Sequence, residues 1–121
     1  MIFVDDELLI GDLAVGLLGD LGYRVRAFTD GADALAAFAA DPGGVDLVIT
    51  DMTMPRMTGD TLALELKWRR PELPVILCTG YSEKLTPEVV AELGVDAFVM
   101  KPVSPARLSQ IMREVLDRRP G

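Results

Sequence analysis

The stretch Val45-Asp46-Leu47-Val48-Ile49-Thr50-Asp51 is a short, nearly continuous apolar run that ends at a carboxylate. Such a run is typical of a strand that is covered on both faces, as in a parallel sheet. We therefore expect a strand at Val45–Thr50. Four similar runs predict further strands at Ile2–Asp5, Tyr23–Ala27, Val75–Thr79 and Ala97–Met100.

Segments with helical spacing alternate with these runs, so we expect five strands and five helices. Asp30 is a suitable helix cap, and Thr86 and Ser104 each precede a proline suited to a first helical turn. Gly94 is suited to end the fourth helix. The last helix is marked by one apolar stripe, namely Leu108, Ile111, Met112, Val115 and Leu116.

The expected first helix contains Gly11, Gly16 and Gly19. An interior glycine costs a helix up to about 1 kcal/mol relative to alanine. Either close packing requires these glycines, or the helix is marginally stable. The same helix carries Leu9 and Leu13, which are candidates for a docking surface and equally for the core.

The alternation of strands and helices predicts an α/β fold with helices on both faces of a parallel sheet. A chain of 121 residues has room for one domain, so we expect a single doubly wound (βα)5 domain over residues 1–121 without an output domain. Right-handed crossovers favour a flavodoxin-like strand order of 2-1-3-4-5. That order opens a crevice at the carboxyl edge, where the first and third strands adjoin.

Composition excludes several classes of protein. Twelve Lys and Arg against nineteen Asp and Glu give a net charge of −7, which leaves little basis for binding nucleic acid. We expect no signal peptide and no membrane insertion, because charges at Asp5 and Asp6 follow only four apolar residues and no later run is long enough. The single cysteine, Cys78, lies in an apolar run, which indicates a buried thiol, and it cannot form an intrachain disulfide. We expect a cytoplasmic protein that is a monomer or a weak dimer.

Histidine is absent from the sequence. Catalytic triads, Cys-His dyads and nearly all zinc sites are therefore excluded, because each requires an imidazole. We expect that the chain is not a classical enzyme. Any chemistry must use Asp, Glu, Lys, Ser or Thr.

Four of the five expected strands end at polar residues, namely Asp5-Asp6-Glu7, Asp51, Thr79 and Lys101-Pro102. Each has an ordinary explanation on its own as a cap, a turn former or a solvated charge. Together they predict one site, because the carboxyl ends of parallel strands meet at one edge of the sheet.

Asp5, Asp6 and Asp51 would repel one another at this edge unless a cation neutralised them. Carboxylates without histidine or cysteine nearby favour a hard divalent ion, and a site with room for water and phosphate oxygens favours Mg²⁺, for which Mn²⁺ should substitute. A carboxylate can also attack phosphorus and form an acyl phosphate. Asp51 is the candidate nucleophile.

Together, Asp5-Asp6, the segment Thr50-Asp51-Met52-Thr53-Met54-Pro55-Arg56-Met57-Thr58-Gly59, Thr79-Gly80 and Lys101-Pro102 resemble the response-regulator receiver domain of two-component systems. The resemblance covers essentially the whole chain. It implies a phosphoprotein of a phosphorelay signal-transduction pathway that assists the phosphorylation and dephosphorylation of its own aspartate.

The resemblance also implies a role for each matching residue. Asp51 would accept a phosphoryl group from a phosphohistidine, Asp6 would ligate Mg²⁺ directly, and Asp5 would assist through water. The backbone carbonyl of Thr53 would complete the protein ligands. Lys101 would pair with the phosphoryl group or with Asp51. The hydroxyl of Thr79 would bond to a phosphate oxygen once Asp51 is modified.

Phe98 falls on the position of the family's switch aromatic, which turns inward as Thr79 moves. From the residues alone, Phe98 is equally a plain core residue. The switch would shift an existing equilibrium between two packings of the fourth and fifth strand loops.

Because the chain has no histidine, its phosphodonor must be a histidine kinase dimerisation domain or a histidine phosphotransfer domain. The first strand begins almost at Met1, which suggests a domain cut from a longer chain. Two stretches, Cys78-Thr79-Gly80-Tyr81-Ser82-Glu83 and Lys101-Pro102-Val103, are similar to those of receivers attached to hybrid sensor histidine kinases, so we expect a parent of that kind.

Three rival functions remain to be weighed. A receiver-like interaction module that never turns over phosphate is the alternative, and the complete set of acidic, hydroxyl and lysine positions argues against it. An aspartyl-phosphate phosphohydrolase would need a second carboxylate where Thr53 stands. A flavin phosphate would be repelled by Asp5-Asp6-Glu7.

Overall fold

The computed structural model describes residues 1–117 apart from 53, 55–56, 80–91, 93 and 101–103. Its strands form one parallel sheet in the order β2-β1-β3-β4-β5. They are β1 (Ile2–Val4), β2 (Arg26–Phe28), β3 (Val48–Asp51), β4 (Val75–Thr79) and β5 (Ala97–Met100). The predicted α/β fold and its strand order are therefore confirmed.

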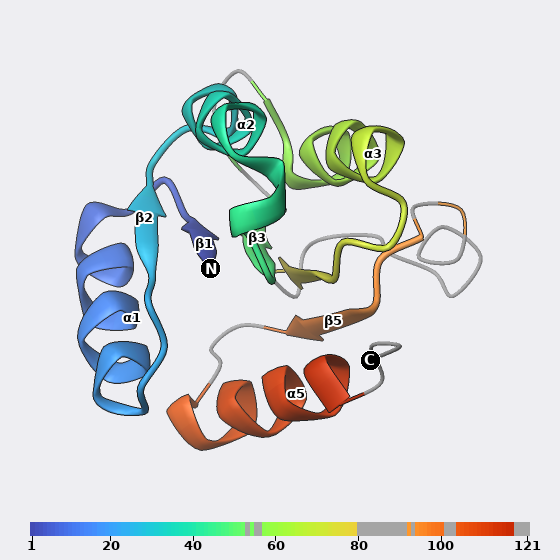
Figure 1. Ribbon diagram of the computed structural model, residues 1–121. Helices are drawn as coiled ribbons and strands as arrows, with labels where there is room; N and C mark the ends of the chain where they lie inside the picture. The colour runs from blue at the N-terminus through green and yellow to red at the C-terminus, as the bar shows by residue number, and fades with distance from the viewer. Residues whose placement is uncertain (53, 55–56, 80–91, 93, 101–103, 118–121) are drawn as a thin grey trace.

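Helices cover both faces of the sheet. They are α1 (Leu8–Asp20), α2 (Gly31–Ala40), α3 (Gly59–Arg69) and α5 (Pro105–Asp117), with a short 3-10 helix, η1 (Pro42–Gly44), after α2. Figure 1 shows α2 and α3 on one face, and α1 and α5 on the other. The expected fourth helix and its cap Thr86 lie outside the described residues, but Gly94, its expected stop, has a φ of 70° that favours glycine.

The sheet separates two hydrophobic cores. Val48 packs with Phe38 and Leu62 on the side of α2 and α3, whereas Ile49 packs with Met112 on the side of α1 and α5. Successive residues of a strand point to opposite faces, so a continuous apolar run fills both cores at once. This is why the stretch around β3 has no polar alternation.

The bounds of three strands, β1, β2 and β3, differ from the prediction. β2 begins at Arg26 rather than Tyr23, because Arg26 pairs with Ile2 at the very start of β1 and the preceding residues have no β1 residue opposite them. β3 begins at Val48 for the same reason, since Ile2 also pairs with Val48. At the other edge β3 extends to Asp51, whereas β1 stops at Val4, one residue before its expected end.

Two of the expected helix caps are confirmed. The carboxylate of Asp30 accepts a hydrogen bond of 2.7 Å from the backbone N–H of Ala32 at the start of α2. The hydroxyl of Ser104 accepts one of 3.1 Å from the N–H of Arg107 in the first turn of α5. Each cap satisfies a backbone donor that the first turn of a helix leaves without an internal partner.

The glycines of α1 have two different environments. A Cβ at Gly11 would lie 3.3 Å from the Cβ of Ala27, so this glycine allows α1 to lie close to β2. A Cβ at Gly16 or Gly19 would meet nothing within 4 Å. Close packing therefore explains the first glycine, and the other two weaken the helix without a packing gain.

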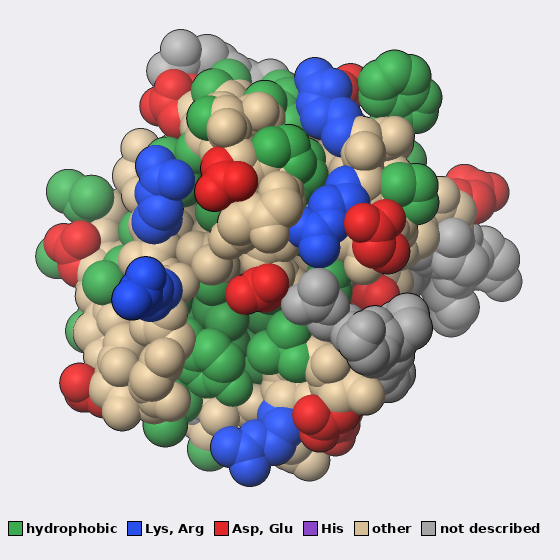
Figure 2. All heavy atoms as spheres, viewed as in Figure 1, with side chains coloured by type: hydrophobic (Ala, Val, Ile, Leu, Met, Phe, Trp, Pro, Cys, Tyr) green, Lys and Arg blue, Asp and Glu red, His purple; other side chains and the backbone are tan. Residues whose placement is uncertain are grey.

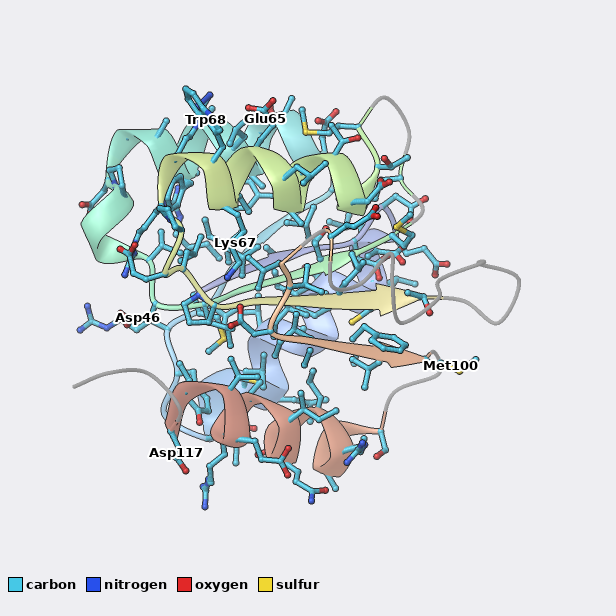
Figure 3. The ribbon with its side chains drawn as sticks, turned by 90° about the vertical axis from the view of Figure 1, so that its right-hand side faces the viewer. Asp46, Glu65, Lys67, Trp68, Met100 and Asp117 are labelled. Carbon is cyan, nitrogen blue, oxygen red and sulfur yellow. The ribbon has the colours of Figure 1, made fainter. Side chains whose placement is uncertain are left out.

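An ion pair anchors the beginning of β5. The carboxylate of Asp96 lies 2.8 Å from the Nζ of Lys67 on α3, and it accepts a hydrogen bond of 2.8 Å from the N–H of Val75. The N–H of Asp96 donates in return to the carbonyl of Val75. Figure 3 shows Lys67 reaching from α3 toward the sheet, while Trp68 and Glu65 point away from it.

Acidic and basic side chains alternate over the face shown in Figure 2, around an area of exposed hydrophobic side chains. Such interspersed charge is unlike the continuous basic stripe that binds a polyanion. Within the described part of the chain, none of the helices has the length and hydrophobicity needed to cross a bilayer.

Candidate functional site

Three strands deliver polar side chains to the carboxyl edge of the sheet. Asp51 is the last residue of β3, Thr79 is the last residue of β4, and Asp5 directly follows β1. All three are buried, which is unusual for the two carboxylates. In Figure 3, Met100 marks the carboxyl end of β5, at the opposite side of the molecule from Asp46, which precedes β3.

The three predicted acidic residues do converge. Asp5, Asp6 and Asp51 each offer one carboxylate oxygen, and these oxygens lie within 4.8 Å of one another. Asp6 is exposed, whereas Asp5 and Asp51 are buried, so the cluster opens to solvent on one side. Its donor atoms are all oxygens, and it leaves access for water and phosphate oxygens, which fits Mg²⁺.

A local turn orients Asp5. Its carboxylate oxygen Oδ1 accepts a hydrogen bond of 2.9 Å from the N–H of Glu7, two residues later. Its own N–H donates to the carbonyl of Phe28 at the end of β2. The side chain is therefore fixed between the end of β1 and the start of α1, as an Asx turn rather than as a helix cap.

Two peptide groups after Asp51 are held by hydrogen bonds. The N–H of Met52 donates to the carbonyl of Cys78 on β4, and the carbonyl of Met52 accepts from the N–H of Gly59, both at 2.8 Å. Gly59 begins α3, and a Cβ there would overlap the carbonyl group of Asp51. The loop from β3 to α3 is thus tied back onto the strand that carries Asp51.

Thr50 lies directly beneath this loop and is fully buried. Its hydroxyl donates a hydrogen bond of 3.0 Å to the backbone carbonyl of Asp51, and it lies 4.0 Å from the sulfur of buried Met54. Sequence reasoning assigned no role to Thr50 or to Gly59. The available signals were a hydroxyl inside an apolar strand and a glycine at the start of a helix.

Of the remaining predicted site residues, the structure describes Phe98 and Thr79. Phe98 lies on β5, paired with Leu77, and 42% of its surface is exposed, so it is not a core residue in this conformation. Thr79 pairs with Met100, the residue before Lys101. Lys101 and Thr53 lie outside the described residues, so their expected roles stay predictions.

Cys78 is buried, as expected, in the core between the sheet and α1 and α5. It pairs with Asp51 across β3 and β4. Its backbone carbonyl, rather than its thiol, contributes to the site by accepting from Met52.

The outer face of α1 is rich in leucine beside the acidic cluster. Leu9 and Leu13 are 75% and 64% exposed, which decides between the core and the surface for these two residues. Leu8 and Leu17 are exposed as well. Because α1 begins three residues after Asp5, this apolar surface adjoins the site.

The chain matches known proteins over nearly its full length. The family model described as "Response regulator receiver domain" matches residues 1–113. Sensory transduction protein RegX3 of Mycobacterium tuberculosis is 36% identical over 118 residues, which are 98% of this chain and 51% of that protein. Sensor kinase CckA of Brucella abortus is 30% identical over 119 residues, which are 98% of this chain and 13% of that protein.

Solved structures agree with these matches. A response regulator receiver domain protein from Clostridium thermocellum superposes with a TM-score of 0.91 at 28% identity, and covers 97% of this chain and 93% of that chain. A CheY-like receiver domain protein from Methanospirillum hungatei has a TM-score of 0.89 at 30% identity, and covers 98% and 93%. The chain spans about half the length of the curated relatives it matches first.

Proposed function

The chain belongs to the response regulator receiver domain family and is a phosphoacceptor, and we propose that Asp51 is the residue that accepts the phosphoryl group. One observation carries this assignment. Asp51 ends the central strand β3 at the point where the carboxylates of Asp5 and Asp6 converge on it. A nucleophile at this edge can be reached from the side on which the cluster opens to solvent, and it is held by the sheet behind it.

The proposed reaction is a direct transfer between two side chains. A carboxylate oxygen of Asp51 forms a bond to phosphorus while the bond from phosphorus to the imidazole nitrogen of a phosphohistidine breaks. The imidazole leaves and takes up a proton from water. The chain contains no histidine, so the phosphohistidine belongs to another domain, which is a histidine kinase dimerisation domain or a histidine phosphotransfer domain.

Asp5, Asp6 and Asp51 would hold Mg²⁺, together with the backbone carbonyl of Thr53. When bound, the ion supplies positive charge to the oxygens of the phosphoryl group during transfer. Asp5 is kept in place for this role by its turn to Glu7. Lys101, which follows β5, would place its ammonium group against the same phosphoryl oxygens.

Thr79 and Phe98 are proposed to report the phosphorylation. Thr79 lies at the end of β4, one strand from Asp51, where its hydroxyl is suited to bond to a phosphoryl oxygen. Phe98 is partly exposed on the adjacent strand β5, and its ring would turn inward on phosphorylation. The phosphoryl group would favour the inward packing by bonding to only one arrangement of Thr79.

The leucine surface of α1 is proposed as the docking site for the phosphodonor. Leu9 and Leu13 lie on the helix that starts beside the acidic cluster. Apolar contacts there would hold the partner's phosphohistidine above Asp51 while leaving the carboxylates accessible.

Two kinds of relative are relevant to the kind of protein in which this receiver domain occurs. The chain covers half of RegX3 and a small part of the sensor kinase CckA. A hybrid sensor kinase as the parent is our proposal, and it rests on the stretches at residues 78–83 and 101–103.

Intact mass after incubation with Mg²⁺ and acetyl phosphate tests the acceptor assignment. We expect a gain of one phosphoryl group that requires Mg²⁺, is removed by hydroxylamine and is absent in Asp51→Asn. A phosphoryl group that persists in Asp51→Asn would place the acceptor elsewhere. A protein that binds Mg²⁺ and gains no phosphoryl group, from acetyl phosphate or from a phosphorylated partner, would favour an interaction module.

A further inference from the structure

The hydroxyl of Thr50 donates a hydrogen bond to the backbone carbonyl of Asp51, the proposed phosphoacceptor. The Thr50 Oγ1 lies 3.0 Å from the carbonyl oxygen of Asp51, and the hydroxyl is fully buried. A β-strand residue does not need a hydroxyl in order to pack, and the neighbours Val48 and Ile49 are aliphatic. The presence of an OH group at this position therefore needs an explanation beyond core packing.

The hydrogen bonds around Asp51 fix the peptide group that follows it. A peptide group is planar, so holding both its carbonyl and its N–H fixes its orientation. Thr50 holds the carbonyl of Asp51, and Cys78 accepts from the N–H of Met52 on the other side of the same peptide. The backbone angle ψ of Asp51 is thereby set, and with it the direction in which the chain leaves the strand.

The next peptide is held at its carbonyl, because the carbonyl of Met52 accepts from the N–H of Gly59. Gly59 also lies against the carbonyl group of Asp51, where a Cβ would not fit. The carbonyl of Asp51 is consequently covered by α3, and its hydrogen bond from Thr50 is made away from bulk water. A buried hydrogen bond of this kind is costly to lose, because a covered carbonyl cannot regain the lost bond from bulk water.

We infer that Thr50 is a positioning residue for the phosphoacceptor, acting through the backbone of Asp51 and the first turn of the loop after β3. The inference rests on the proposed role of Asp51. The hydroxyl of Thr50 bonds to the backbone of Asp51 rather than to its carboxylate, and it holds the backbone from which that carboxylate projects. Groups that orient ligands in this way typically change metal affinity or activity by tenfold or more when they are removed.

Two matched pairs of variants isolate the hydroxyl. The first pair is the native protein and Thr50→Val, which keeps the shape of threonine and removes the OH group. The second pair is Thr50→Ser and Thr50→Ala, which both lose the methyl group and differ in the OH group. The readouts are the rate of phosphorylation by acetyl phosphate at saturating Mg²⁺ and the affinity for Mn²⁺ measured by electron paramagnetic resonance. The second readout requires no phosphorylation.

We expect Thr50→Val to lose about tenfold in rate or in Mn²⁺ affinity at a temperature where it is fully folded. Thr50→Ser should stay within about threefold of the native protein, and Thr50→Ala should resemble Thr50→Val. If Thr50→Val does not fold, the comparison of serine with alanine decides the question. Equal rates and equal affinities within each pair, with a change in stability alone, would overturn the inference.

The role of Asp51 and the role of Thr50 are tested by different results. If the native protein itself gains no phosphoryl group while Asp51→Asn binds Mn²⁺ as the native protein does, the role of Asp51 is wrong. If the native protein is phosphorylated and the hydroxyl makes no difference, only the role of Thr50 is wrong.

Discussion

Gly59 shows how strongly one residue constrains the acceptor site. A Cβ at this position would overlap the carbonyl group of Asp51 and lie 2.9 Å from the Cδ1 of Leu77. Backbone cannot move aside as a flexible side chain can, so Gly59→Ala should displace the start of α3. We expect a loss of about 1–3 kcal/mol in the free energy of unfolding in urea, together with slower phosphorylation of Asp51.

Gly16→Ala is the matched control for this substitution. Gly16 lies in the interior of α1, where an added Cβ meets nothing within 4 Å. The same chemical change should therefore stabilise the protein by about 0.5–1 kcal/mol. If Gly59→Ala is as stable as the native protein, the close approach of α3 to Asp51 is not a constraint.

The residues of the site divide into those that sequence predicts and those that it does not. The convergence of Asp5, Asp6 and Asp51 followed from strand ends alone, because parallel strands end at one edge. Thr50 and Gly59 were missed because their contacts depend on the path of the loop after β3, which neither spacing nor periodicity specifies.

At the scale of elements, the ion pair between Lys67 on α3 and Asp96 before β5 should contribute to the free energy of unfolding. β5 is an edge strand that pairs with β4 on one side, so a second strand does not hold its other side. The Lys67 and Asp96 side chains are 15% and 35% exposed, and Asp96 also bonds to the N–H of Val75. Lys67→Met should cost about 1.5 kcal/mol in urea unfolding, since a hydrogen bond between charged groups is lost near the protein interior.

The ion pair of Arg69 with Glu65 provides the comparison. It joins two residues of α3 at 3.8 Å, with side chains 37% and 46% exposed. Exposed pairs within a helix contribute about 0.3–0.5 kcal/mol. Arg69→Met should therefore cost less than Lys67→Met, and equal costs would show that Asp96 does not anchor β5.

The leucine surface of α1 gives a second prediction at this scale. Leu9→Ser combined with Leu13→Ser should slow phosphotransfer from a protein donor by at least about tenfold, because an apolar contact area is lost on binding. Transfer from acetyl phosphate needs no docking and should change far less. Leu64→Ser on α3, a half-exposed leucine away from the site, is the control. Equal slowing with both donors would place the effect in the chemistry of Asp51.

Elements themselves were predicted better than their ends. β4 and β5 have the expected bounds, because the apolar runs there coincide with the residues that pair. The expected starts of β2 and β3 were too early, because β1 begins at Ile2 and limits the pairing on both sides. Strand ends depend on the partner strand, which lies far away in the sequence. Apolar residues such as Val45 and Leu47 are buried without belonging to the strand.

For the whole molecule, the sheet order explains why one edge carries the site. β1 lies between β2 and β3, so the chain reverses its direction across the sheet at β1. The loops after β1 and β3 run to opposite faces, to α1 and to α3, and leave the carboxylates of Asp5 and Asp51 between them. The fold therefore concentrates negative charge in a molecule that already has a net charge of −7.

This concentration of charge predicts that Mg²⁺ stabilises the folded chain. The unfolded chain does not hold Asp5, Asp6 and Asp51 together, so the cation binds the native state selectively and stabilises it by about 2.7 kcal/mol at a hundred times its dissociation constant. Urea unfolding with MgCl₂ or MnCl₂, against NaCl at equal ionic strength, measures this effect.

Asp6→Asn should reduce the stabilisation by Mg²⁺. It should also raise the stability without Mg²⁺, because repulsion within the carboxylate cluster falls. Asp12 is an exposed residue of α1 outside the cluster, so Asp12→Asn should leave the stabilisation by Mg²⁺ unchanged. If Mg²⁺ stabilises both variants as much as the native protein, it binds elsewhere.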